Sequence, residues 1–79
     1  NGSWYDENAL TCATRLYPFG SWLYITNLAN SKSVIVRVTD RIGKRFAKSR
    51  IDLSKRAFYI LSDGHLELGL IKVKIINDK

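Results

Sequence analysis

Two neighbouring segments with strong β character constrain the fold of this chain more than any other feature. "SWLYITNL" (residues 21–28) and "SVIVRVTD" (residues 33–40) are rich in aromatic and β-branched residues, which favour strands. Only the short segment "ANSK" separates them, so the pair predicts a β-hairpin. In the second segment Val34, Val36 and Val38 share one face, which we expect to lie in the core.

The rest of the chain predicts three more short strands and one helix. The strands are expected at residues 9–14, 50–53 and 70–77, and the helix at residues 54–62. Because short strands dominate and the single helix comes late, this order predicts a small β-barrel with a helical crossover. The length allows one domain, which we place at residues 1–79.

Several residues next to these elements have predicted structural roles. Tyr17 and Phe19, in the turn "LYPFG", are expected to anchor the core. Either Asp52 or Ser54 can cap the helix, and Asp52 can alternatively bind the barrel loop or serve as a second carboxylate. The helix face expected in the core consists of Leu53, Ala57, Ile60 and Leu61.

The charge of the chain favours an anionic partner. The net charge is +6, and residues 37–56 hold eight Lys or Arg against two Asp. Such a segment suits nucleic acid, an anionic lipid surface or an acidic glycan, and it is also typical of a solvated loop. We do not expect nucleic acid, because the sequence has neither the interleaved exposed aromatics of a single-strand binder nor a recognition-helix motif.

The same composition argues against several other classes of protein. Cys12 is the only cysteine, so it has no partner for an internal disulfide and belongs to no Cys cluster that would bind a metal. No apolar run approaches the roughly 20 residues of a membrane span. We therefore expect no metal, no cofactor and no transmembrane segment, and we expect a monomer.

Two long motifs carry a resemblance to a known family. "ALTCATRLYPFGSWLYITNLANSKSVIVRVTDR" and the later "IDLSKRAF" closely resemble the RlpA-like double-psi β-barrel, a fold related to expansin and barwin barrels. The resemblance implies a mainly β fold: a small six-stranded double-psi barrel with one short helix at about residues 54–62. The opening strand of that family would precede Asn1, so either the chain has been trimmed or the barrel lacks its first strand.

The resemblance also implies a function in the cell envelope. RlpA-type enzymes are lytic transglycosylases that cleave peptidoglycan between N-acetylmuramic acid and N-acetylglucosamine, and they are periplasmic, outer-membrane-associated or extracellular. Their catalytic aspartate, in an Asn-Asp-Arg motif, falls on Asp40, which Arg41 follows here. Their histidine falls on Thr14 and their upstream acid near Ser3. Because both of these positions differ, the alternative is a non-catalytic, expansin-like barrel that binds glycan.

The residues around Asp40 suggest how an acidic polysaccharide would be held. Arg41, Lys44 and Arg45 can pair with the lactyl and peptide carboxylates of peptidoglycan. Thr14 can make one hydrogen bond to a sugar, and Trp4 is the favoured aromatic platform for a sugar ring. Trp22 and Tyr24 lie two residues apart on one strand, so both face the core or both face outward.

Overall fold

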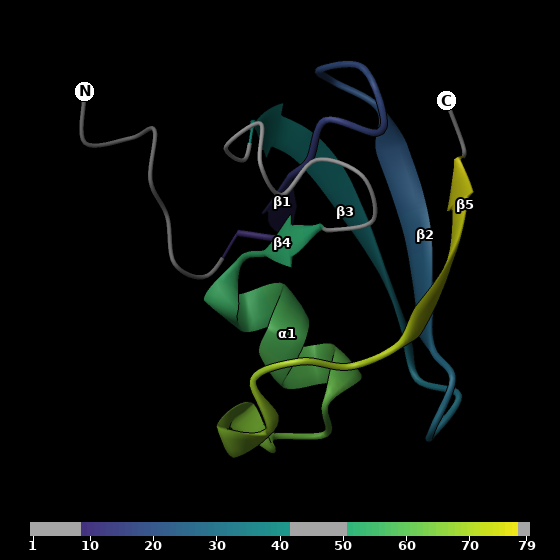
Figure 1. The fold of residues 1–79 in the computed structure, drawn as a ribbon, viewed down its shortest axis with the longest axis vertical. Coiled ribbons are helices and arrows are strands. Elements are labelled where there is room, and N and C mark those ends of the chain that lie inside the picture. The colour runs from purple at the N-terminus through teal and green to yellow at the C-terminus, as the bar shows by residue number, and fades with distance from the viewer. Residues whose placement is uncertain (1–8, 42–50, 78–79) are drawn as a thin grey trace.

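In the computed structural model, one sheet curls around one side of a single helix (Figure 1). The structure describes residues 9–41 and 51–77. In chain order the elements are β1 (Thr11–Ala13), β2 (Trp22–Asn27), β3 (Ser33–Asp40), β4 (Asp52–Leu53), α1 (Lys55–Leu61), the 3-10 helix η3 (Leu66–Leu68) and β5 (Val73–Asn77). All five predicted strands and the predicted helix are therefore present.

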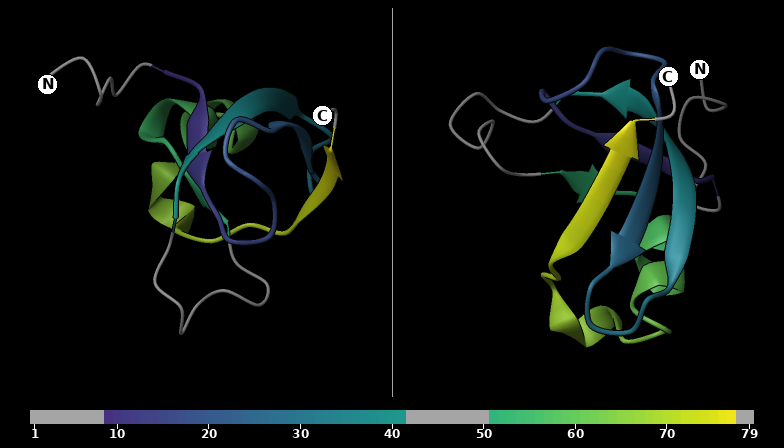
Figure 2. Two further views of the ribbon diagram at one scale, coloured as in Figure 1. Left: turned by 90° about the horizontal axis from the view of Figure 1, so that it is seen from above. Right: turned by 90° about the vertical axis from the view of Figure 1, so that its right-hand side faces the viewer.

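The five strands lie in the order β4-β1-β3-β2-β5. The β1–β3 pair is parallel and the three other pairs are antiparallel. Figure 2 shows how far the sheet curls: viewed from above, it forms a half-barrel with α1 along one side. The mainly β fold with one short helix is thus confirmed. The described residues form five strands of the expected six-stranded barrel.

The β2–β3 hairpin supplies most of the core. Val34, Val36 and Val38 of β3 are buried, as predicted, and opposite them Leu23 and Ile25 of β2 have no exposed surface. The strict alternation of buried and exposed residues reflects the two-residue period of a strand that has one face in the core.

Helix α1 completes the core from the other side. Its predicted face is confirmed: Ala57 and Leu61 are fully buried, and Leu53 and Ile60 pack against them. Ser54 is the N-cap, since its hydroxyl accepts a hydrogen bond from the Ala57 N–H (3.3 Å). Of the two residues that the sequence offered as the cap, Asp52 and Ser54, the structure therefore has Ser54.

Two asparagines join the hairpin to the end of this helix. The side-chain amide of Asn27, which is 3% exposed, donates to the carbonyl of Leu61 at 2.8 Å. Asn30, in the turn between β2 and β3, donates to the same carbonyl at 3.0 Å. These bonds satisfy a carbonyl that the last turn of a helix leaves unpaired.

Three expectations need correction or refinement. Phe19 was expected in the core, but 59% of its surface is exposed, while Tyr17 does pack against the core. Trp22 and Tyr24 both face outward, because Leu23 and Ile25 occupy the inward positions of the strand. The final strand begins at Val73 rather than at residue 70. In the described part of the chain, no helix is long and apolar enough to cross a membrane.

Candidate active site

Asp40 is the last residue of β3 and is held at its backbone by β1. Its carbonyl accepts a hydrogen bond from the N–H of Thr14 at 3.1 Å. The register of the parallel β1–β3 pair slips by one residue between Cys12 and Ala13, so that Ala13 lies opposite Asp40. The side chain is exposed, and its Oδ1 accepts the N–H of Arg41 at 2.7 Å. The structure thus presents the Asp40 carboxylate at a fixed strand end.

Arg41 ties the loop after β1 to this strand end. Its Nη1 donates to the carbonyl of Thr14 at 2.8 Å and to the carbonyl of Tyr17 at 2.7 Å. Its guanidinium lies 4.2 Å from the centre of the Phe19 ring. This stacking explains why an exposed Phe19 is ordered there. The predicted binding of substrate by Arg41 stays a prediction; the contacts that the structure shows for its side chain are with the loop after β1.

Thr14 lies beneath the surface of the site. It is fully buried, and its hydroxyl accepts the N–H of Leu16 at 3.0 Å. This short turn is one that threonine side chains commonly stabilise. The structure therefore gives no support to the predicted contact between Thr14 and a sugar, and it assigns the hydroxyl an internal partner instead.

The loop that Arg41 holds is closed by further bonds to the end of β3. The Gly20 N–H donates to the carbonyl of Val38 at 2.8 Å, and the Val38 N–H donates to the carbonyl of Ser21 at 2.9 Å. Gly20 has a φ of +83°, a conformation that glycine adopts without steric cost. The Ser21 hydroxyl donates to the carbonyl of Pro18 at 2.7 Å. The wall beside Asp40 is thus fixed largely by backbone hydrogen bonds.

A second carboxylate belongs to the same part of the sheet. Ala13 of β1 lies between Asp40 on β3 and Asp52 on β4. Since neighbouring strands are about 4.8 Å apart, the two aspartate backbones are separated by about 10 Å. Asp52 is partly buried. The sequence offered Asp52 as a possible second carboxylate, but it did not predict the position of Asp52 two strands from Asp40, because the parallel β1–β3 pairing leaves no local signal.

Several predicted site residues lie elsewhere. Trp4, Ser3, Lys44 and Arg45 fall outside the described residues, so their predicted roles stay predictions. His65 lies on the surface and pairs with Glu67 at 3.0 Å. The pKa of Glu67 is lowered, first by a hydrogen bond from its own backbone N–H and then by His65. Among residues 9–41 and 51–77, no cluster of His, Cys, Asp and Glu has the three ligands that a metal site needs.

Burial determines the pKa of the Cys12 thiol, which lies near this site. Cys12 is 3% exposed and precedes Ala13 in β1. Loss of hydration raises the pKa of the Cys12 thiol from 9.0 to about 11. The side chain is therefore a neutral core residue at physiological pH, and it takes no part in the surface chemistry of the site.

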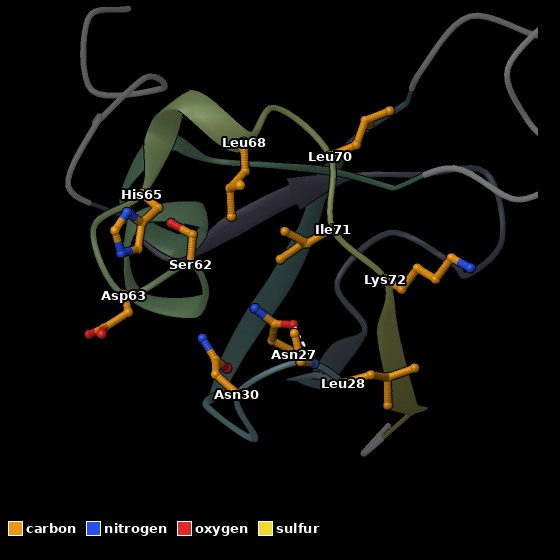
Figure 3. Close-up of a pocket in the computed structure, with 11 residues that line it drawn as sticks. Asn27, Leu28, Asn30, Ser62, Asp63, His65, Leu68, Leu70, Ile71 and Lys72 are labelled. Atoms are coloured by element: carbon orange, nitrogen blue, oxygen red, sulfur yellow. Dashed lines mark hydrogen bonds between the residues drawn. The ribbon is translucent and has the colours of Figure 1, made fainter.

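A pocket of about 650 Å³ lies at the opposite end of β3 from Asp40 (Figure 3). Its polar side chains include Asn27 and Asn30, which already bind the end of α1. Leu28, Leu68 and Leu70 supply much of its apolar wall. The other seven residues of β3 separate this pocket from Asp40, a length of roughly 23 Å. It is therefore not part of the candidate active site.

The described residues form a curled half-barrel of five strands with one α-helix, an arrangement consistent with a fragment of a double-psi β-barrel. The family model described as "Lytic transglycolase" matches residues 1–75. The chain therefore belongs to the lytic transglycolase family, and the predicted resemblance to RlpA-like domains is confirmed.

Curated relatives support the same assignment. The chain is 44% identical over 75 residues to the "Probable endolytic peptidoglycan transglycosylase RlpA" of Treponema pallidum, an alignment that covers 95% of this chain and 23% of the relative. It is also 44% identical to the "Endolytic peptidoglycan transglycosylase RlpA" of Pseudomonas aeruginosa, and that alignment covers 95% of this chain and 21% of the relative. The Neisseria meningitidis protein of the same name is 45% identical over an alignment that covers 94% of this chain and 30% of the relative. The chain thus spans less than a third of the length of these relatives.

Proposed function

We propose that this domain cleaves the glycan strands of peptidoglycan as a lytic transglycosylase, with Asp40 as the general acid and base. The observation that carries the proposal is the placement of Asp40: an exposed carboxylate on a strand end that Thr14 and Arg41 hold in place. Membership of the lytic transglycolase family and the names of the relatives support the substrate. A domain with this substrate works in the cell envelope.

The proposed chemistry needs only one carboxyl group. Protonated Asp40 donates its proton to the glycosidic oxygen while the bond from that oxygen to the anomeric carbon of N-acetylmuramic acid breaks. A hydroxyl of the same sugar then bonds to the anomeric carbon and gives its proton to the Asp40 carboxylate. The products are an anhydro-sugar end and a free N-acetylglucosamine end, and no water is consumed.

The cationic residues have two different parts in this proposal. Arg41 keeps the wall rigid, because its Nη1 is already bonded to the carbonyls of Thr14 and Tyr17. Lys44 and Arg45 would attract the lactyl and peptide carboxylates of the substrate, and Trp4 would stack on a sugar ring. These three residues follow from the sequence rather than from the described structure.

A specific observation favours a second candidate function, glycan binding without cleavage. The family histidine is replaced by Thr14, whose buried hydroxyl is bonded to the Leu16 N–H and cannot carry a charge near neutral pH. The family acid is replaced near Ser3. A barrel with these changes could hold the same glycan strand in an expansin-like manner.

The test is digestion of purified peptidoglycan by the wild type and by Asp40→Asn, with the products identified by mass spectrometry. We expect anhydromuramyl ends from the wild type and at least a hundredfold fewer from the variant. Asp63→Asn is the matched control, since Asp63 is an exposed acid paired with Lys32 at the far end of the hairpin. Binding without products from either protein would favour the second candidate. Cleavage that survives Asp40→Asn but is lost in Asp52→Asn would assign the acid to Asp52.

A further inference from the structure

The side of the sheet that faces away from α1 carries a band of exposed aromatic, aliphatic and cationic side chains. Residues directly opposite in antiparallel strands point to the same side, so the register arranges this band in three rows. The rows are Arg37–Trp22, then Ile35–Tyr24–Ile76, then Ser33–Thr26–Lys74. We call these eight residues the outer face. Figure 2 (right) looks onto its three strands, β5, β2 and β3, side by side.

The large side chains of the outer face contribute little to the core. Trp22 is 44% exposed, Tyr24 41%, Ile35 47% and Ile76 48%. These four side chains are neighbours in the sheet register, and adjoining exposed apolar side chains can form an interaction surface. The alternation of β2 assigns Leu23 and Ile25 to the core, so both aromatic rings remain available to a ligand.

The polar groups on this face are arranged around the aromatic rings. The Arg37 guanidinium lies over the Trp22 ring, 5.2 Å from its centre, so a cation partly covers one face of the indole and leaves the other face for a ligand. At the other end of the face, the hydroxyls of Thr26 and Ser33 are 2.9 Å apart. Lys74 adds a second cation opposite Thr26. None of the eight residues is acidic.

We propose that the outer face is a second binding surface for an anionic polysaccharide, separate from the Asp40 site; the substrate class rests on the proposed function. Trp22 and Tyr24, about 7 Å apart along one strand, offer two ring faces to successive sugars. Arg37 and Lys74 pair with carboxylates on the strand, and the hydroxyls bind sugar hydroxyls.

Charge and position favour a glycan over a second copy of this chain. Two outer faces in contact would bring Arg37 and Lys74 against like charges, in a protein whose net charge is already +6. Arg37 lies three residues before Asp40 on β3, so the outer face and the candidate site lie at the same end of this strand.

The experiment measures binding to insoluble peptidoglycan by sedimentation, in the Asp40→Asn background so that the polymer stays intact. Trp22→Ala combined with Tyr24→Ala should weaken binding about tenfold or more. Tyr59→Ala is the matched control: Tyr59 is 47% exposed and lies under Arg56, but on helix α1. It should bind within twofold of its parent. Circular dichroism checks folding, and Tyr24→Ala alone serves if the double variant does not fold.

A second arm tests the charge of the ligand. Neutral chitin carries the sugar rings but no carboxylates, so it should bind more weakly than peptidoglycan. Arg37→Gln with Lys74→Gln should reduce both that difference and the salt dependence of binding. An oligo-dT strand, which also stacks on aromatic rings, should bind no differently to the aromatic variant and its parent.

The outcomes separate this inference from the proposed function. If the wild type cleaves peptidoglycan but the aromatic variant binds like its parent, the inference is wrong and the proposed function stands. If nothing is cleaved but the aromatic variant loses binding, the second surface is supported and catalysis is not. Absence of peptidoglycan binding by the parent, or a loss confined to oligo-dT, overturns the inference.

Discussion

The backbone N–H of Thr14 donates a hydrogen bond to the carbonyl of Asp40, 26 residues further along the chain, at 3.1 Å. The loop after β1 is thereby attached to the strand that carries the candidate acid. Arg41 strengthens the attachment through its bond to the Thr14 carbonyl. The geometry of the Asp40 carboxylate thus depends on a contact between distant segments, which makes the stability of that contact measurable.

Replacement of Arg41 tests this clamp. Arg41→Ala removes two charge-assisted hydrogen bonds to carbonyls and the stacking on Phe19, so we expect the free energy of unfolding to fall by about 2 kcal/mol. Arg56→Ala, which removes a longer stacking contact with Tyr59 at 5.8 Å, should cost less than about 0.5 kcal/mol. Urea denaturation followed by circular dichroism measures both. Equal costs would show that Arg41 does not act as a clamp.

The two asparagines at the end of α1 allow a direct comparison of buried and exposed hydrogen bonds. Asn27→Ala leaves the buried Leu61 carbonyl with one partner fewer and removes an acceptor for the Ala29 N–H, which should cost about 1–3 kcal/mol. Asn30→Ala removes a bond to the same carbonyl, but from an exposed residue. We therefore expect it to lower the free energy of unfolding by less than about 1 kcal/mol. Thermal unfolding measures the difference. A larger loss for Asn30 would contradict this assignment.

Much of this fold can be predicted from local patterns. The alternation of Val34, Val36 and Val38 fixes both the hairpin and its buried face, and the spacing of Ala57 and Leu61 fixes the inner face of the helix. The outward position of Trp22 is harder to predict from the sequence, because aromatic side chains suit either face of a strand. It is decided by Leu23 and Ile25, which fill the space beside the helix.

The candidate site is harder to predict, because non-local pairings build it. Asp40 can be selected from the family motif, but the burial of Thr14 depends on a parallel pairing between β1 and β3 and on a slip in its register. The position of Phe19 likewise depends on Arg41, whose role as a clamp has no signature in the spacing of these residues. An aromatic residue next to a turn therefore looks like a core anchor until its cationic partner is known.

The buried thiol gives a prediction for alkaline pH. A pKa of about 11 rather than 9.0 lowers the thiolate fraction near pH 8 about a hundredfold, so native Cys12 should react with a disulfide reagent at least a hundredfold more slowly than in urea. The rate at several pH values, with and without denaturant, checks this. Native reactivity equal to that of the denatured chain would show that the thiol is not buried.

The same pKa also predicts how stability changes with pH. Because the pKa of Cys12 is raised in the folded state, its stabilising contribution is complete below the pKa of the unfolded chain, near 9. That contribution is lost as the pH rises toward 11. The free energy of unfolding should therefore fall more steeply over this range for the wild type than for Cys12→Ala. Parallel curves would contradict the prediction.

Ser54 links the start of α1 to β1, and its loss should affect both. Its hydroxyl donates to the Ala9 carbonyl at 2.7 Å and accepts from the N–H groups of Thr11 and Ala57, each at 3.3 Å. Ser54→Ala removes a helix cap and the two bonds to the β1 segment, so we expect it to cost about 2 kcal/mol.

Ser62→Ala is the control for this last change, because Ser62 is also buried at an end of the helix, but its hydroxyl makes only a long bond, at 3.5 Å, to the Tyr59 carbonyl. It should cost less than about 1 kcal/mol. Hydrogen exchange adds a readout that a cap alone would not change: the Cys12 and Ala13 amides of β1 should exchange faster in Ser54→Ala. If exchange increases only in the first turn of α1, Ser54 is a helix cap without a role in holding β1.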